Sequence, residues 1–317
     1  LYYEWLLHES EFGIGLKNSE HAAPNIEGNP ALPLGWLRVV DCTRGTAGPR
    51  ATGILADYGA DVVWVEPPGG DPYRSKLSPE YSAFNRSKRS IEIDLRHEPG
   101  RSELYGLVAE ADLFVESWQP GVARSLGVDY GTLQRVAPTL VYCSISGFGE
   151  AGAYRNIPGH ESIVHALAGI MEYQSGHRDG PIYPALPQAS LGAAYLAVIG
   201  SLSALYQRRS DGRGRRIETS LFDGALAYMM TWGVTDRDTS GHIPGDRRAV
   251  TRTFQCADEE FIAVHTGAVG AFNRLLDVLS LTDRIAPSGD GLDMSVRATA
   301  EEMQVLIDEL PAMFRQR

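Results

Sequence analysis

The chain has 317 residues, of which 43% are hydrophobic and 22% are charged. These fractions are ordinary for a soluble globular protein and exclude a disordered chain. The formal net charge is −11, from 40 acidic and 29 basic residues. This balance argues against a broad surface for nucleic acid or an anionic membrane, but it leaves room for a local basic pocket that binds a small anion.

The three cysteines, Cys42, Cys143 and Cys256, lie far apart and form no CxxC pair. We therefore expect no disulfide framework and no cysteine-rich zinc site, and we expect buried thiols in a reducing cytosol. No run reaches the roughly 18 apolar residues of a membrane span. Acidic residues also stand where a secretory signal would carry basic ones. The sequence thus predicts a cytoplasmic protein with no membrane, nucleic-acid or metal partner.

The regular pattern begins after residues 1–35, which we expect to form an extension and a linker rich in Pro, Gly and Asn. Strands are predicted at 36–42, 61–68, 89–95, 112–118 and 139–149, and helices at 48–60, 98–111 and 127–138. Strands that alternate with helices predict right-handed βαβ units and a mostly parallel sheet. We therefore predict an α/β fold with a Rossmann-like, doubly wound domain at 36–150.

The pattern changes after residue 150. Helices are predicted at 160–174 and 189–210, and a strand and a buried helix follow within 212–232. The helix at 189–210 is rich in Ala and Gly, so it should pack closely against other helices. Strands near 252–256 and 261–265 and a helix near 270–280 follow. These elements predict a helical region at 151–235 and a smaller α+β domain at 236–317.

Common catalytic motifs are absent. The chain contains no GxxxxGK[ST] phosphate loop, no HExxH and no GxSxG nucleophile elbow. The segment GTAGPRATG (45–53) follows the first strand but lacks the GxGxxG spacing. A conventional NAD-binding fold is therefore not expected.

Six short segments occur in a fixed order along the chain. They are DCTRGTAGPRATGILADYGADVVWVEPPGGDPYR (41–74), FNRSKRSIEIDL (84–95), ESWQPGVARSLGVDYGTL (116–133), VYCSISGFGEAGAY (141–154), PGHESIVHALAGIM (158–171) and SDGRGRRIETSLFDGAL (210–226). Together they resemble the family III CoA-transferases of the CaiB/BaiF type, a group that also contains the alpha-methylacyl-CoA racemases. The resemblance covers about residues 36–280.

The resemblance implies a coenzyme A thioester as substrate, a carboxylic acid as second substrate, and no metal or redox cofactor. It also implies an interlocked homodimer. Family members usually continue well beyond this length, so we expect that a C-terminal part is missing or that another chain supplies it. A tandem protein with a second CoA-transferase domain would explain both this and the N-terminal extension.

Five basic residues lie close together in the sequence, namely Arg74, Lys76, Arg86, Lys88 and Arg89. Such a cluster can hold the phosphates of coenzyme A by charge-assisted hydrogen bonds, although a solvated basic loop would look the same. The resemblance assigns the nucleotide end of CoA to NRSKRS, which includes Asn85, Lys88 and Arg89. It assigns the pantetheine to the loop with Thr46 and Ala47.

Two further CoA contacts are implied by ESWQPGVARSLG (116–127). Trp118 matches an aromatic position on the path of CoA. The family usually has PGVxERLG, whereas here Ser125 replaces the Arg and Arg124 is displaced by one position. We therefore expect a weaker CoA contact or a rerouted one.

Asp179, in RDGPIYPA, matches the family's nucleophile, a carboxylate that attacks the thioester and carries the CoA in turn. The alternative is a plain Asp-Gly-Pro turn. His160 and Glu161 match the family's GHD element and are the secondary catalytic candidates. Ala189 or Ser190 stands where the racemases carry a second acid, and neither can transfer a proton, which favours a transferase over a racemase.

A third hypothesis is a catalytically degenerate half that only binds CoA. It arises because the expected acid before the long helix is absent. The stretch at 239–254, which follows the central helices, also has only two glycines, Gly241 and Gly245.

Overall fold

The structure, a computed structural model of the chain, describes residues 32–76, 78–171, 181–229, 249–286 and 298–317. Nearly all of the predicted extension at 1–35 lies outside the described residues. The chain forms two compact units, one of residues 1–164 and 188–228, the other of residues 165–187 and 229–317. The first unit therefore includes the whole of the long helix at 188–211 and the strand after it. The sequence-based domain limits at 35, 150 and 235 stay a prediction.

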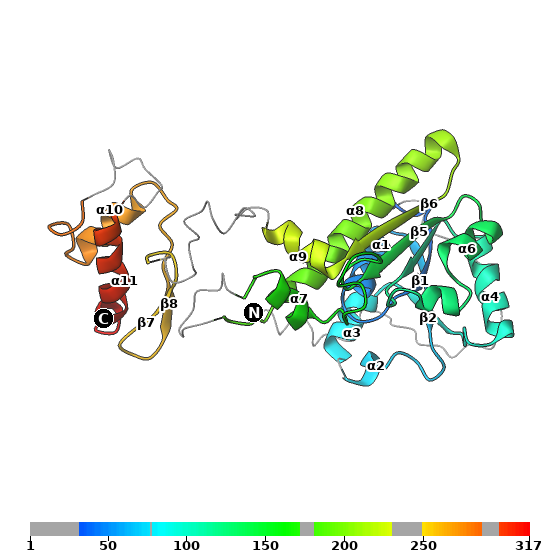
Figure 1. Cartoon of the computed structure of the whole chain (residues 1–317), viewed down its shortest axis with the longest axis horizontal. Helices are drawn as coiled ribbons and strands as arrows, with labels where there is room; N and C mark the ends of the chain where they lie inside the picture. Colours follow the sequence, from blue (N-terminus) through cyan, green and yellow to red (C-terminus); the bar gives the residue numbers. More distant parts are fainter. Residues whose placement is uncertain (1–31, 77, 172–180, 230–248, 287–297) are drawn as a thin grey trace. The chain divides into compact units, whose positions relative to one another are not determined.

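A six-stranded sheet, parallel throughout, forms the centre of the first unit (Figure 1). Its strands are β1 (Arg38–Cys42), β2 (Asp61–Glu66), β3 (Arg89–Glu92), β4 (Leu113–Glu116), β5 (Val141–Ser146) and β6 (Arg215–Ser220). The order is β3-β2-β1-β4-β5-β6, so the winding reverses between β1 and β4. This confirms the predicted Rossmann-like α/β architecture, and β6 extends the sheet by one strand.

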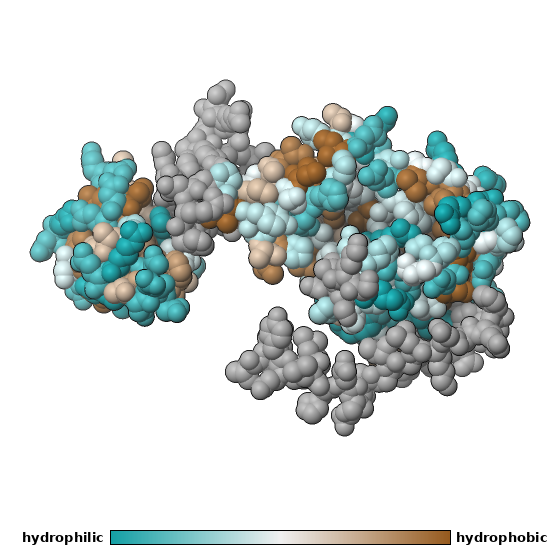
Figure 2. Space-filling model, turned by 90° about the horizontal axis from the view of Figure 1, so that it is seen from below, coloured by the Kyte–Doolittle hydropathy of each residue, from teal (hydrophilic) through white to brown (hydrophobic). Residues whose placement is uncertain are grey.

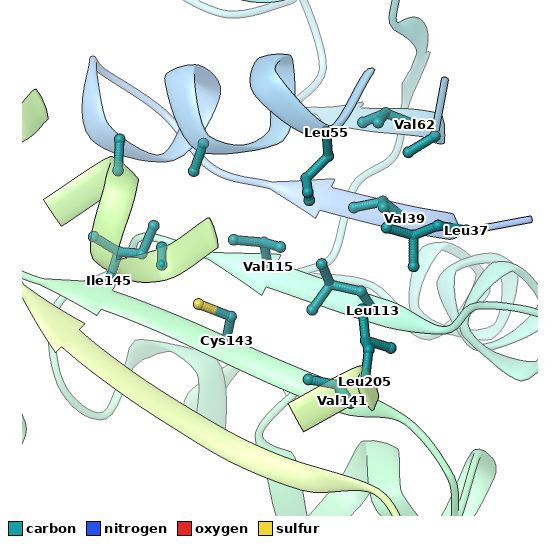
Figure 3. Packing of buried hydrophobic residues seen from close by; sticks show 14 of the residues in the cluster. Leu37, Val39, Leu55, Val62, Leu113, Val115, Val141, Cys143, Ile145 and Leu205 are labelled. Carbon is teal, nitrogen blue, oxygen red and sulfur yellow. The ribbon is translucent and has the colours of Figure 1, made fainter. Parts of the chain in front are cut away.

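Helices cover both faces of this sheet (Figure 1). The described helices between residues 47 and 229 are α1 (Ala47–Asp57), α2 (Tyr73–Lys76), α3 (Ser78–Asn85), α4 (Glu98–Ala109), α5 (Val122–Ser125), α6 (Tyr130–Val136), α7 (Glu161–Leu167), α8 (Gln188–Asp211) and α9 (Leu221–Met229). On one face, Leu55 of α1 points toward Val39 and Leu205 of α8 lies beside Val141 (Figure 3). On the other face, α4 and α6 cover Phe114 and the rest of a second core. Strands buried on both faces explain the nearly continuous apolar runs in the sequence.

The helix α8 is long and apolar enough to cross a membrane by length and composition alone. The expectation that no run has this length was therefore wrong. The reason is that small residues, Ala and Gly, are spread between the larger apolar ones. Half of its most apolar window is buried inside the protein. A Cβ on Gly192 would lie 2.4 Å from the carbonyl oxygen of Gly224, so α9 crosses α8 with no room for a side chain, which confirms the predicted close packing.

The second unit has a core of its own. It contains the antiparallel strands β7 (Thr253–Gln255) and β8 (Phe261–Ala263) and the helices α10 (Ala271–Val278) and α11 (Ala300–Phe314). Phe254 and Phe314 stack with their ring centroids 4.4 Å apart. The two strands and α10 confirm the predicted elements. The sequence reasoning did not predict α11, although Thr299 and Glu302 form a capping box at its start.

Candidate active site

A small pocket opens near the carboxyl ends of β1 and β2. Its volume is ≈ 50 Å³, and it is lined by Gly45, Thr46, Pro49, Trp64, Asp71, Tyr73, Tyr81, Phe84 and Asn85. In open α/β sheets, ligands bind outside the carboxyl ends of the strands, near the point where the winding reverses. β1 is one of the two strands that flank this point. The aromatic lining suits a ligand with planar or apolar parts.

The loop after β1 is held in place by buried hydrogen bonds. Asp41, fully buried at the end of β1, accepts hydrogen bonds from the amide of Thr43 (2.9 Å) and from its hydroxyl (2.6 Å). The indole of Trp64 donates to the carbonyl oxygen of Thr43 at 3.0 Å. This loop places Thr46 in the pocket wall. Ala47, implied in the same role, is buried in the core beside the sheet.

The predicted basic cluster is paired with carboxylates. The ion pairs are Arg74 with Glu66, Arg86 with Asp57 (2.5 Å), Lys88 with Asp41 (3.1 Å) and Arg89 with Asp61 (2.6 Å). The side chain of Lys76 lies outside the described residues. A phosphate bound at any of these four positions has to compete with a carboxylate. Direct contact of these side chains with CoA therefore stays a prediction.

Lys88 is the most deeply buried member of this cluster, with 1% of its side chain exposed. Its ammonium group donates to Asp41 (3.1 Å), to the carbonyl oxygen of Pro49 (2.9 Å) and to Oδ1 of Asn85 (2.9 Å). Burial lowers the pKa of Lys88, and the charge of Asp41 opposes this shift. With all three protons in use, Lys88 joins β1, α1 and α3. A contact with a CoA phosphate would require the ammonium group to leave these partners.

The two predicted contacts after β4 have different surroundings. Trp118 is half-buried against the core on the α4 and α6 side. Arg124 is exposed at the end of α5. The hydroxyl of Ser125 donates to the carbonyl oxygen of Val122 at 2.8 Å. The Ser125 side chain therefore bonds within its own helical turn, while the side chain of Arg124 is exposed to solvent.

Glu161 connects the start of α7 to the start of α8. Its carboxylate accepts hydrogen bonds from the amides of Ala189 (2.7 Å) and Ser190 (3.1 Å) and from the Ser190 hydroxyl (2.5 Å). A carboxylate at this position satisfies helix N–H groups that have no partner within the helix and complements the helix dipole. Glu161 thus holds the first turn of α8. His160 beside it is exposed, and its amide donates to the carbonyl oxygen of Pro158 at 2.9 Å.

Asp179, the predicted nucleophile, lies within 172–180, outside the described residues. A hydrogen bond connects the described residues on its two sides: the amide of Ile182 donates to the carbonyl oxygen of Met171 at 3.0 Å. The catalytic role of Asp179, and its distance from His160 and Glu161, stay predictions.

Glu116 is a buried carboxyl that the sequence reasoning did not single out. It ends β4 with 3% of its surface exposed, and it accepts hydrogen bonds from the amide of Trp118 (2.7 Å) and the hydroxyl of Tyr142 (3.4 Å). Burial raises the pKa of Glu116, and a hydrogen bond with Ser144 partly offsets that rise. The available signal was an acidic residue at the end of the apolar run DLFVE, where a parallel strand reaches the ligand-binding edge.

Glu116→Gln is expected to change how stability depends on pH. A carboxyl whose pKa is raised by folding binds its proton more tightly in the folded chain. The contribution of Glu116 to the free energy of unfolding therefore falls as the pH rises from the ordinary pKa of 4.5 through the folded-state pKa. The amide of the variant does not titrate, so E116Q should gain stability relative to the parent across this window and then level off. Urea denaturation over a pH series measures the difference.

Glu103→Gln, at an exposed position on α4, controls for the change in net charge. A stability difference between E116Q and the parent that does not vary with pH would contradict the assignment of a proton to the buried carboxyl.

The fold and the pocket define an α/β protein with a pocket at the carboxyl edge of a parallel sheet, and solved structures share this architecture. A CAIB/BAIF family protein from Brucella suis is 28% identical, with a TM-score of 0.69 over 90% of this chain and 79% of that chain. Rv3272 from Mycobacterium tuberculosis is 24% identical, with a TM-score of 0.75 over 91% and 80%, and supports the fold alone.

The family model of CoA-transferase family III matches residues 34–317. The chain therefore belongs to CoA-transferase family III, which confirms the resemblance found in the six sequence segments.

Curated relatives carry the names of CoA-transferases. Acetyl-CoA:oxalate CoA-transferase of Acetobacter aceti is 36% identical over 275 residues, which are 80% of this chain and 69% of that enzyme. Succinyl-CoA–D-citramalate CoA-transferase of Chloroflexus aurantiacus is 32% identical over 313 residues, 88% and 77% respectively. Human succinyl-CoA:glutarate CoA-transferase is 31% identical over 214 residues, 65% of this chain and 49% of that enzyme. This chain thus spans between about half and three quarters of the length of these three relatives.

Proposed function

We propose that this chain transfers coenzyme A from an acyl-CoA thioester to a carboxylic acid. The observation that carries the proposal is the family III match over residues 34–317. The aromatic pocket at the carboxyl edge of the sheet supports it, because the adenine of CoA is planar and its pantetheine arm carries methyl and methylene groups between its amides. Relatives named for transfer from acetyl-CoA or succinyl-CoA to an organic acid support the substrate class.

In the proposed mechanism, the carboxylate of Asp179 attacks the thioester carbonyl and breaks the C–S bond. CoA leaves as a thiolate, and Asp179 holds the acyl group as a mixed anhydride. The thiolate then attacks the Asp179 carbonyl, which releases the first acid and leaves an aspartyl-CoA thioester. The incoming carboxylate displaces the thiolate to form a second anhydride. Attack of the thiolate on the new acyl carbon completes the transfer and restores Asp179.

Coenzyme A is the transferred group in this reaction, and the proposed steps involve no metal and no redox cofactor. Within the described residues, no group of three or more His, Cys, Asp or Glu side chains is placed to hold a metal ion. Each tetrahedral intermediate needs hydrogen-bond donors for its oxyanion, and backbone N–H groups commonly supply them. In the sequence a glycine, Gly180, directly follows Asp179.

The racemase alternative is less well supported. Racemisation with two bases needs an acid at the start of α8, and Ala189 and Ser190 occupy that place. Glu161 binds both positions instead. The alternative of a degenerate half makes a different prediction, namely that the chain binds CoA but does not exchange it between acids. Experiment can therefore distinguish the two.

The test is a screen for exchange. The purified chain is incubated with each of several acyl-CoA donors, including acetyl-CoA and succinyl-CoA, together with a panel of mono- and dicarboxylates. Liquid chromatography with mass spectrometry follows the new acyl-CoA. We expect exchange for at least one donor and acceptor pair. Binding of CoA without exchange for any pair, while a family III enzyme of known activity succeeds in the same assay, would overturn the proposal.

We also propose that the chain acts as a homodimer or beside a second CoA-transferase domain. Family membership supports this, and so does the surface of α8, where Tyr195, Ile199 and Tyr206 are 44%, 62% and 77% exposed. Other apolar residues on the unit that contains the sheet form brown patches among polar residues in Figure 2. Burial of such side chains against a second copy would remove apolar surface from water.

A cytoplasmic location is proposed from the cysteines. All three are free thiols, two of them buried, as is usual in a reducing compartment.

A further inference from the structure

Arg44 is an exposed cation next to the pocket. It stands in the loop after β1, directly before Gly45 and Thr46, which form part of the pocket wall. Its guanidinium makes no hydrogen bond or ion pair with any residue that the structure describes. By contrast, Arg74, Arg86, Lys88 and Arg89 all pair with carboxylates.

Hydrogen bonds to Ser117 hold the backbone of Arg44. Ser117 follows β4, the strand on the other side of the winding reversal from β1. The hydroxyl of Ser117, directly after β4, accepts a hydrogen bond from the Arg44 amide at 2.9 Å and lies 3.3 Å from its carbonyl oxygen, to which it donates. Gly45 continues the loop with φ +77°, and a Cβ there would meet nothing within 4 Å. The loop therefore turns at Gly45, directly after Arg44, and the space beside Gly45 is open.

An anionic ligand on a protein with a net charge of −11 needs a local cation that is not already neutralised. The paired residues of the basic cluster would have to give up a carboxylate to bind a phosphate, whereas Arg44 would not. A guanidinium also matches the geometry of a phosphate through two parallel hydrogen bonds.

From these observations we propose that Arg44 binds a phosphate group of coenzyme A and that Ser117 positions it. This inference rests on the proposed CoA-transferase function. The pocket that Gly45 and Thr46 line also has aromatic walls, which favour CoA over a small acceptor acid. The carboxylate of such an acid is the other anion that Arg44 could bind.

The test compares substrates with and without phosphates. For Arg44→Gln, we expect KM for acyl-CoA to rise roughly 10- to 100-fold, the range for a charge-assisted hydrogen bond, with little change in kcat. With the corresponding acyl-pantetheine, which has no phosphate, R44Q and the parent should give the same kcat/KM. Ser117→Ala should raise KM for acyl-CoA by a smaller factor, and Ser117→Thr should restore it.

Arg209→Gln is the matched control. Arg209 is exposed near the end of α8. Its neighbour Arg208 pairs with Asp112, directly before β4, so this end of α8 lies at the amino edge of the sheet, opposite to the pocket. Equal KM values for acyl-CoA in R44Q and R209Q would overturn the proposal. So would an R44Q effect on KM of the acceptor acid alone. Urea midpoints show that each variant is folded.

The failure of this inference can be separated from failure of the proposed function. If the parent exchanges no acyl group, the function fails, and calorimetric titration with CoA still decides the role of Arg44. Weaker CoA binding by R44Q than by R209Q would support the inference, and equal binding would overturn it.

Discussion

Asp179→Ala is expected to abolish CoA transfer, with a fall in kcat of at least about 10³-fold and no loss of the folded state. A nucleophile that forms every covalent intermediate cannot be replaced by a methyl group, and removal of such residues from other enzymes costs several orders of magnitude in kcat. The measurement is the steady-state rate for the best donor and acceptor pair from the screen. CoA binding by calorimetry should stay close to that of the parent.

The competing interpretation, that Asp179 only shapes a turn, has its own control. Asp258 is exposed in a turn of the second unit, where its carboxylate accepts a hydrogen bond from the amide of Glu260 at 3.1 Å. Asp258→Ala should leave kcat close to that of the parent. Equal kcat values for D179A and D258A would show that Asp179 only shapes a turn and has no catalytic role.

A trapping experiment locates the intermediate directly. Hydroxylamine added during turnover converts an aspartyl anhydride or thioester into a hydroxamate, which mass spectrometry places on one peptide. We expect the modification at Asp179. Modification at Glu161 instead would move the nucleophile to the carboxylate at the start of α7.

The sheet and its larger helices could be predicted from the sequence because parallel strands buried on both faces form short apolar runs, and the helices between them end at Gly or polar residues. The first five strands were predicted in this way. The short helices α2, α3 and α5 were not, because four to eight residues carry too little periodic pattern. The spacing of Thr299 and Glu302 is that of a capping box, a signal in the sequence from which α11 could have been predicted.

The surroundings of the basic cluster could not be predicted from sequence proximity. Its carboxylate partners come from β1, α1 and β2, and the Lys88 partner Asp41 lies 47 positions earlier in the chain. The parallel pairing of β1, β2 and β3 brings Lys88 near Asp41 and Arg89 near Asp61, and the packing of α3 on α1 brings Arg86 near Asp57. The same pairing explains why an apparently free cluster is neutralised, while Arg44, which drew no attention in the sequence, is left without a carboxylate partner among the described residues.

Lys88→Met is expected to destabilise the first unit by about 3–5 kcal/mol, the usual cost of removing one partner of a buried ion pair. The substitution leaves the carboxylate of Asp41 fully buried, with the hydroxyls of Thr43 and Thr52 as its remaining side-chain partners. It also leaves the carbonyl oxygen of Pro49 without the ammonium group. Urea denaturation, followed by tryptophan fluorescence, measures the change in the free energy of unfolding.

The double variant Asp41→Asn/Lys88→Met should recover part of this loss, because it removes both buried charges and leaves none uncompensated. Arg86→Met breaks the more exposed pair with Asp57 and should cost no more than about 1 kcal/mol. A nucleotide-binding role for Lys88 predicts the reverse pattern, in which K88M keeps its stability and loses CoA affinity. The two measurements on one variant therefore decide whether Lys88 holds the loop beside the pocket or holds the substrate itself. If K88M alone does not accumulate as folded protein, recovery of folding in the double variant assigns the loss to the charge left on Asp41.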